Sequence, residues 1–289
     1  MSGGVFTVRI AGRQWRVQAD IRKTRDDLLE WLGPWASASP GGSQPAANIS
    51  VETARNAGNE TARILWNPQG VDAKLENFSL SADWNAAPWK ARLLSRPEYA
   101  PAALGAALRM LAMKTVIASD GVVLHASSVR FGGGVLVFAG AAGSGKTAAA
   151  SRFPPEDRLD ADTVFISPQG GWTRVDAPDW TAPSRSAPDA SPGLRVKAVV
   201  FPRPADGFRI ERVSRAKAVK MCIHMPPHGL FPDAPFVQKT IDALARLASD
   251  LPPALMFWRL SDDIPALLRD FLASPPSVPL QPPSSAITA

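Results

Sequence analysis

The chain has 289 residues, of which 45% are hydrophobic and 20% charged, a composition typical of globular proteins rather than of disordered or fibrous chains. No apolar run approaches the roughly 18–20 residues that span a bilayer, and the first residues lack the charged and then apolar layout of a signal peptide. Cys222 is the single cysteine, which excludes an internal disulfide and fits a reducing compartment. We therefore expect a cytoplasmic protein with no membrane partner.

The formal net charge is +6, from 32 Lys and Arg residues against 26 Asp and Glu residues. Proteins that bind nucleic acid gather such charge in a dense tract or on one face. The basic residues of this chain are instead scattered along the sequence. We therefore expect no nucleic-acid partner.

The N-terminal part carries several strand patterns. Residues 5–20 alternate apolar and polar side chains around Ala11 and Gly12, which predicts a β-hairpin. Residues 36–47 are rich in Ser, Gly and Pro and predict a loop. Turn residues bound three further predicted strands, at 48–53, 61–66 and 78–84. Together these patterns predict an antiparallel, β-rich region within residues 1–115, with no motif that suggests chemistry.

The rest of the chain alternates helix and strand patterns. A helix is predicted over residues 101–117, with Pro101 in its first turn and leucines at helical spacing. Further strands are predicted at 122–125, 127–131, 135–138, 158–166, 194–201 and 257–260, and further helices at 214–221, 237–248 and 264–272. We expect residues 116–273 to form one domain, followed by a disordered tail over 274–289.

The strongest chemical signal is the segment GAAGSGKT, residues 140–147, which fits the P-loop pattern Gly-x-x-x-x-Gly-Lys-[Ser/Thr] in full. It lies between an apolar strand and an Ala-rich helix, the context that the motif requires. Small residues let successive backbone N–H groups face phosphate oxygens, while the lysine reaches the outer phosphates and the final hydroxyl ligates Mg²⁺. The motif predicts binding of ATP and Mg²⁺ by Gly140, Ala141, Ala142, Gly143, Ser144, Gly145, Lys146 and Thr147.

The flanking segments differ from those of an ordinary P-loop ATPase, in which a later strand ends in an acid. The predicted strand at 194–201 runs into Pro202 and Arg203 instead. The nearest acids downstream of the loop lie in the segment DRLDADTVFI, residues 157–166, and His125 precedes the loop.

The order LHASSVRFGGGVLVFAGAAGSGKT followed by RLDADTVFI resembles the HPr kinase/phosphorylase family and its relatives over residues 121–170. The resemblance implies an α/β (α+β) fold with a mixed sheet and a P-loop core like that of the ATP-dependent phosphoenolpyruvate carboxykinases. It also implies a kinase that transfers the γ-phosphate of ATP to a hydroxyl, commonly a serine, of a peptide, a protein or a small molecule. Well-studied members form rings, so the resemblance leaves a homo-oligomer open.

The resemblance also implies residue roles. His125 matches the strand histidine that the family places near the transferred phosphate, and Asp162 matches one of two paired aspartates. Asp162 would take the proton of the acceptor hydroxyl and, with Thr147, hold Mg²⁺. Lys146 would offset the charge that develops on the phosphate.

One acid of the family's aspartate pair is missing. If the apolar positions after the pair are aligned, Asp162 matches the second aspartate and Ala161 the first; an alignment from the preceding residues instead makes Thr163 the second. We prefer the first alignment, because a slip of one residue turns every side chain to the other face of a strand. Asp160 could partly replace the missing acid, although on an ideal strand it shares a face with Asp162.

Two alternative functions stay open. The incomplete aspartate pair also suits a nucleotide-binding module without phosphotransfer, and a P-loop ATPase is a further alternative.

A metal site could also be considered near Cys222, where His224 and His228 follow. No fourth ligand lies in range, so we expect a loop without metal.

Overall fold

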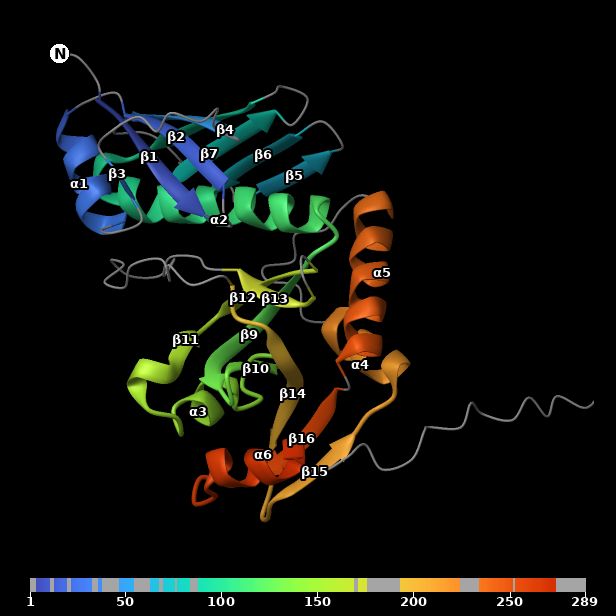
Figure 1. Ribbon diagram of the computed structural model, residues 1–289. Helices are drawn as coiled ribbons and strands as arrows, with labels where there is room; N and C mark the ends of the chain where they lie inside the picture. Colours follow the sequence, from blue (N-terminus) through green and yellow to red (C-terminus); the bar gives the residue numbers. More distant parts are fainter. Residues whose placement is uncertain are drawn as a thin grey trace, which may run out of the picture. The chain divides into compact units, whose positions relative to one another are not determined.

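The chain folds into two mixed β-sheets and six α-helices and belongs to the α+β class, which confirms the predicted class at this level (Figure 1). These counts refer to the residues that the computed structural model describes: 4–10, 13–19, 22–32, 36–37, 47–54, 63–67, 70–75, 77–83, 88–168, 171–175, 193–223, 234–251 and 253–273. His224, His228 and the predicted tail at 274–289 lie outside these ranges.

Two compact units divide the chain, and each combines separate segments. The first contains Met1–Val123, Phe165–Arg195 and Pro226–Ala243, and the second contains Leu124–Val164, Val196–Met225 and Leu244–Ala289. The predicted phosphate loop, His125 and Asp162 all belong to the second unit. The expected division into residues 1–115 and 116–273 stays a prediction.

The first sheet lies in the first unit. Its strand order is β3 (Ala36–Ser37), β1 (Gly4–Ile10), β2 (Arg13–Ala19), β4 (Ala47–Thr53), β8 (Trp89–Ser95), β7 (Phe78–Asp83), β6 (Gly70–Leu75) and β5 (Arg63–Asn67). The β1–β2 pairing confirms the predicted hairpin around Ala11 and Gly12. The predicted antiparallel pairing holds within β3–β1–β2 and within β8–β7–β6–β5. It is wrong for β4, which pairs in parallel with both β2 and β8. Parallel neighbours need a long crossover, and helix α1 (Arg22–Leu32) lies in the connection from β2 to β4.

Helix α2 (Ala100–Ala118) follows the 3₁₀ turn Pro97–Tyr99 and packs into the core of the first unit. Leu104, Leu108 and Leu111 are fully buried among sheet residues such as Phe6 and Leu80. By length and composition, the segment Pro97–Ala118 could cross a membrane, so the expectation that no apolar segment reaches that length is wrong. The burial of 78% of its apolar window inside the protein accounts for this composition, since a core helix is apolar on most of its surface.

The second sheet carries the candidate site. Its order is β13 (Thr173–Val175), β12 (Thr163–Ser167), β9 (Val122–Phe131), β10 (Gly134–Ala139), β14 (Val196–Pro204), β16 (Ala254–Trp258) and β15 (Arg209–Arg212), and β11 (Arg158–Asp160) also pairs with β9. Residues 122–131 form one strand where two were predicted. Residues 158–166 contain a break where one strand was predicted, and the last predicted strand begins three residues earlier than expected.

Three parallel strands form the core of the second unit. Phe138 of β10 pairs with Val200 of β14, which in turn pairs with Ala254 of β16. Four helices follow α2 along the chain (Figure 1): α3 (Lys146–Ala150), α4 (Arg215–Ile223), α5 (Ala234–Asp250) and α6 (Ile264–Ala273). The carboxyl ends of parallel strands are where open α/β sheets bind ligands, so the loop after β10 lies at the expected edge.

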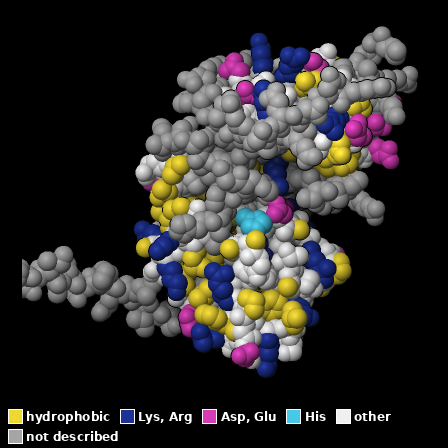
Figure 2. Space-filling model, turned by 180° about the vertical axis from the view of Figure 1, so that it is seen from behind, with side chains coloured by type: hydrophobic (Ala, Val, Ile, Leu, Met, Phe, Trp, Pro, Cys, Tyr) yellow, Lys and Arg dark blue, Asp and Glu magenta, His cyan; other side chains and the backbone are white. Residues whose placement is uncertain are grey.

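Charged side chains are dispersed over the described surface. On the face shown in Figure 2, Lys and Arg side chains are spread among apolar and acidic ones rather than gathered in one tract. Several exposed charges are paired, as in Arg92 with Glu52 at 2.7 Å and Lys239 with Asp120 at 3.2 Å. The Arg92 guanidinium lowers the pKa of Glu52, chiefly through their hydrogen bonds.

Replacing Leu108 by Ala should lower the free energy of unfolding by about 2–5 kcal/mol, because it removes buried methyl groups and leaves a cavity. Ala102→Ser on the exposed side of α2 is the control and should change stability by no more than about 0.5 kcal/mol. Urea denaturation of both variants measures the difference. Equal urea midpoints for Leu108→Ala and Ala102→Ser would contradict the buried position of Leu108.

Candidate functional site

The loop between β10 and α3 has the backbone geometry that its glycines permit. Gly143 and Gly145 have φ of 75° and 91°, in the left-handed region that other residues rarely adopt. A Cβ atom on Gly140 would lie 2.3 Å from the Ser144 hydroxyl oxygen. The three glycines of the motif are therefore required by the conformation of the loop itself.

Apolar packing fixes the chain beyond the loop. Helix α3 is a short helix, after which Phe153 is buried against Phe138 and meets Phe131 edge to face, with ring centroids 5.6 Å apart. The Arg158 guanidinium then donates to the carbonyls of Ser151 and Phe153. These contacts close the turn that returns the chain to β9 by way of β11.

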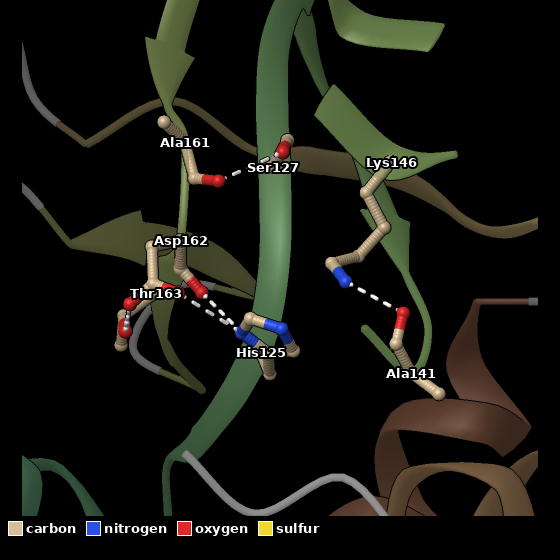
Figure 3. Close-up of polar contacts among 7 residues, drawn as sticks. All are labelled: His125, Ser127, Ala141, Lys146, Ala161, Asp162 and Thr163. Carbon is tan, nitrogen blue, oxygen red and sulfur yellow. Dashed lines mark hydrogen bonds and ion pairs between the residues drawn. The ribbon is translucent and has the colours of Figure 1, made fainter. Parts of the chain in front are cut away.

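Lys146 is buried and lies across the loop. Its Nζ donates a hydrogen bond of 2.9 Å to the carbonyl of Ala141 (Figure 3). Burial lowers the pKa of Lys146 below its usual 10.5, and the negative charge of Asp162 partly opposes that shift. Lys146 and Asp162, which are 16 positions apart in the sequence, thus lie within electrostatic range of each other.

Strand β9 brings the loop and Asp162 together. On one edge of β9, Ala126 pairs with Ala139, the last residue before the loop. On the other edge, the Ala126 N–H donates to the Asp162 carbonyl at 3.0 Å. His125 precedes Ala126 on this strand and lies between the two segments (Figure 3).

His125 and Asp162 form a half-buried pair. Nδ1 of His125 lies 3.1 Å from Oδ1 of Asp162 and 3.0 Å from its backbone carbonyl. Both partners are acceptors, so Nδ1 carries a proton and donates it. Thr163 donates to the other carboxylate oxygen of Asp162 at 3.0 Å. Hydrogen bonds therefore orient the carboxylate through both of its oxygens.

Asp160 has a different environment from Asp162, and the expectation that they share a strand face is wrong. The chain breaks between β11 and β12, at Ala161 and Asp162, so strand alternation does not continue across the two acids. Ser128 on β9 donates a short hydrogen bond to Asp160, and Ser127 donates to the Ala161 carbonyl at 3.1 Å. Asp160 is thus held against β9, and Ala161 contributes its backbone carbonyl to a hydrogen bond with the same strand.

The donor set for a metal is small. Among the described residues, no group of three or more His, Cys, Asp or Glu side chains could hold a metal ion. Thr147 is exposed and Asp162 is half-buried. One hydroxyl and one carboxylate suit Mg²⁺, which usually keeps several waters and takes its other ligands from substrate phosphates. Burial raises the pKa of Cys222 to about 12, so its thiol carries a proton at neutral pH and is a poor metal ligand.

Sequence reasoning missed one residue at the loop. Trp258, the last residue of β16, is buried, and a Cβ atom on Gly145 would lie 3.3 Å from its ring. The predicted strand at 257–260 contains this tryptophan, so an aromatic residue at the end of a late strand was the available signal.

No protein-family model matches the chain, and no curated protein sequence matches it.

The depressed pKa of Lys146 predicts a pH dependence of stability. The folded state loses this proton at a lower pH than the unfolded state, so the unfolded chain binds more protons between the lowered pKa and 10.5. Over that window, wild type should gain unfolding free energy relative to Lys146→Met as the pH rises. Urea titrations at several pH values measure both unfolding free energies, and a wild-type value that falls relative to that of Lys146→Met as the pH rises would contradict the burial of the ammonium group.

Proposed function

We propose that the protein is an HPr-kinase-like kinase that binds ATP with Mg²⁺ at residues 140–147 and transfers the γ-phosphate to a hydroxyl of a peptide, a protein or a small molecule. The observation that carries the proposal is the approach of the His125–Asp162 pair to the loop of Lys146 across β9. A phosphate-binding loop beside an oriented carboxylate provides both a phosphate site and a base.

Nucleotide binding would use backbone and side-chain groups of the loop. The backbone N–H groups of the loop and the Lys146 ammonium would contact phosphate oxygens, for which Lys146 would leave the Ala141 carbonyl. A phosphate anion is a stronger partner for an ammonium group than a neutral carbonyl is. Mg²⁺, when bound, would offset charge on the β- and γ-phosphates, held by Thr147 and Asp162.

Transfer would need a base at Asp162. The acceptor O–H would give its proton to the Asp162 carboxylate as its oxygen bonds to the γ-phosphorus, and the bond from that phosphorus to the β–γ bridging oxygen would break to release ADP. His125 would keep the carboxylate aimed through the Nδ1–H contact at 3.1 Å. Lys146 would offset the charge that moves onto the leaving phosphate.

A nucleotide-binding module without transfer is the second candidate. It is favoured by Ala161, which is exposed and stands where the family has an acid. The P-loop ATPase alternative is less well supported, because β14 ends in Phe201, Pro202, Arg203 and Pro204 with no acid. A cytoplasmic location, the absence of nucleic-acid and membrane partners, and a homo-oligomeric state stay predictions.

Lys146→Ala should weaken ATP binding at least about 100-fold, since it removes the loop's cationic phosphate ligand. Isothermal titration calorimetry with MgATP measures the change. Lys239→Ala, in the other unit, removes an exposed lysine of the same chemistry and should bind ATP as wild type does. Wild-type affinity in Lys146→Ala would reject the loop as the nucleotide site.

Asp162→Asn should abolish phosphate transfer while ATP binding persists, because the amide keeps the shape of the carboxylate and cannot accept the proton. Incubation with γ-labelled ATP and candidate peptides or cell extract measures transfer, with a loss of about 10²-fold or more expected.

Asp160→Asn is the matched control for the transfer assay. It alters the nearby acid that Ser128 engages and should keep most of the transfer activity. Tight ATP binding by wild type without any labelled product would favour the non-catalytic module.

A further inference from the structure

Two buried polar side-chain atoms lie at the loop without hydrogen-bond partners. They are the hydroxyl oxygen of Ser144 and the indole Nε1 of Trp258. The two residues are 5% and 2% exposed, respectively. Within the described part of the second unit, these are the buried side-chain nitrogen and oxygen atoms that lack a partner.

Both atoms border the glycines of the motif. The Ser144 oxygen lies 2.3 Å from the position that a Cβ atom on Gly140 would take, and Trp258 Nε1 lies 3.5 Å from the corresponding position on Gly145. A side chain at either glycine would therefore meet one of these groups. Because glycine has no side chain, both polar atoms can lie close to the loop backbone.

The placement of Trp258 follows from the sheet. Strands β10, β14 and β16 run parallel, and Trp258 ends β16 as Ala139 ends β10. The carboxyl edge of such strands is the edge at which ligands bind. The indole therefore reaches the loop from a segment more than 100 positions later in the chain.

Buried donors without partners are uncommon in proteins, because each loses its bonds to water and gains nothing in return. When such donors cluster at one site, a role in binding a ligand is a physical reason for their presence. Both donors are neutral O–H or N–H groups, and the acceptor that this loop would hold is a phosphate oxygen.

We propose that Ser144 Oγ and Trp258 Nε1 donate hydrogen bonds to phosphate oxygens of the bound nucleotide, which makes Trp258 a ligand-binding residue supplied by β16. The inference rests on the proposed nucleotide site and adds to it two side-chain donors besides Lys146. It names the phosphate chain, rather than the base or sugar, as the part of the ligand that Trp258 recognises.

Two conservative variants test the proposal by calorimetry with MgATP and with inorganic pyrophosphate. Trp258→Phe removes the N–H and keeps an aromatic ring, and Ser144→Ala removes only the hydroxyl. Each should weaken both ligands about tenfold, the loss expected for one hydrogen bond to a charged acceptor. A loss for ATP alone, with pyrophosphate unchanged, would overturn the assignment to phosphate.

The chain supplies a matched control in Trp15. Its indole Nε1 is also buried without a partner, and its side chain is fully buried in the first unit. Trp15→Phe makes the same chemical change and should bind both ligands as wild type does. Equal weakening in Trp15→Phe and Trp258→Phe would reject a specific role for Trp258.

A spectroscopic measurement keeps the proposal falsifiable if Trp258→Phe folds poorly. In protein labelled with ¹⁵N at tryptophan, the Trp258 indole N–H signal, assigned by its loss in the variant or by its proximity to Gly145, should move downfield on addition of pyrophosphate. An unmoved signal while pyrophosphate binds would reject the hydrogen bond and leave the nucleotide site intact. Failure of wild type to bind either ligand would reject both proposals.

Discussion

The backbone hydrogen bond from Ala126 to the Asp162 carbonyl is the contact on which the candidate site depends. Ala126 also pairs with Ala139, so one residue of β9 sets the position of the loop on one edge and of Asp162 on the other. His125, its neighbour, is placed between them by the alternation of the strand. A slip of β9 by one residue would turn His125 to the opposite face and separate it from Asp162.

The candidate site holds several groups in arrangements that cost stability. Lys146 is buried with a lowered pKa, and the hydroxyl of Ser144 and the indole N–H of Trp258 lack hydrogen-bond partners. Conformational strain and unsatisfied polar groups concentrate at functional sites, where a ligand recovers part of the cost. The rest of the second unit, with its apolar core around Phe138, Val200 and Met256, provides the stability that this arrangement requires.

The strand before the loop, the helix after it and the N-terminal hairpin could be predicted from the sequence, because their signals are local. A run of small residues between an apolar strand and an Ala-rich segment indicates the connection from β10 to α3, and the alternation around Ala11 and Gly12 predicts the hairpin. The parallel pairing of β4 with β2 and β8 depends on contacts between distant segments, which periodicity does not report.

The missed features of the site have the same cause. The break at Ala161 is stabilised by hydrogen bonds from Ser127 and Ser128 on another strand, and Trp258 meets Gly145 only through the pairing of β16 with β14. Local sequence patterns do not indicate partners that lie far away in the chain. Helix α1 was also missed, since its apolar stripe is narrow among charged residues.

The tight turn at Gly132 and Gly133 affects the order in which the parts of the site form during folding. Both glycines have positive φ, which suits the tight turn that joins β9 to β10, so His125 and the start of the loop are linked by a short hairpin. Contacts that close short loops form sooner than those that close long ones. His125 and the loop between β10 and α3 can therefore come together early during folding, whereas the indole of Trp258 reaches the loop only after β14 and β16 have paired. During folding, the backbone of this loop would therefore form before the tryptophan packs against it.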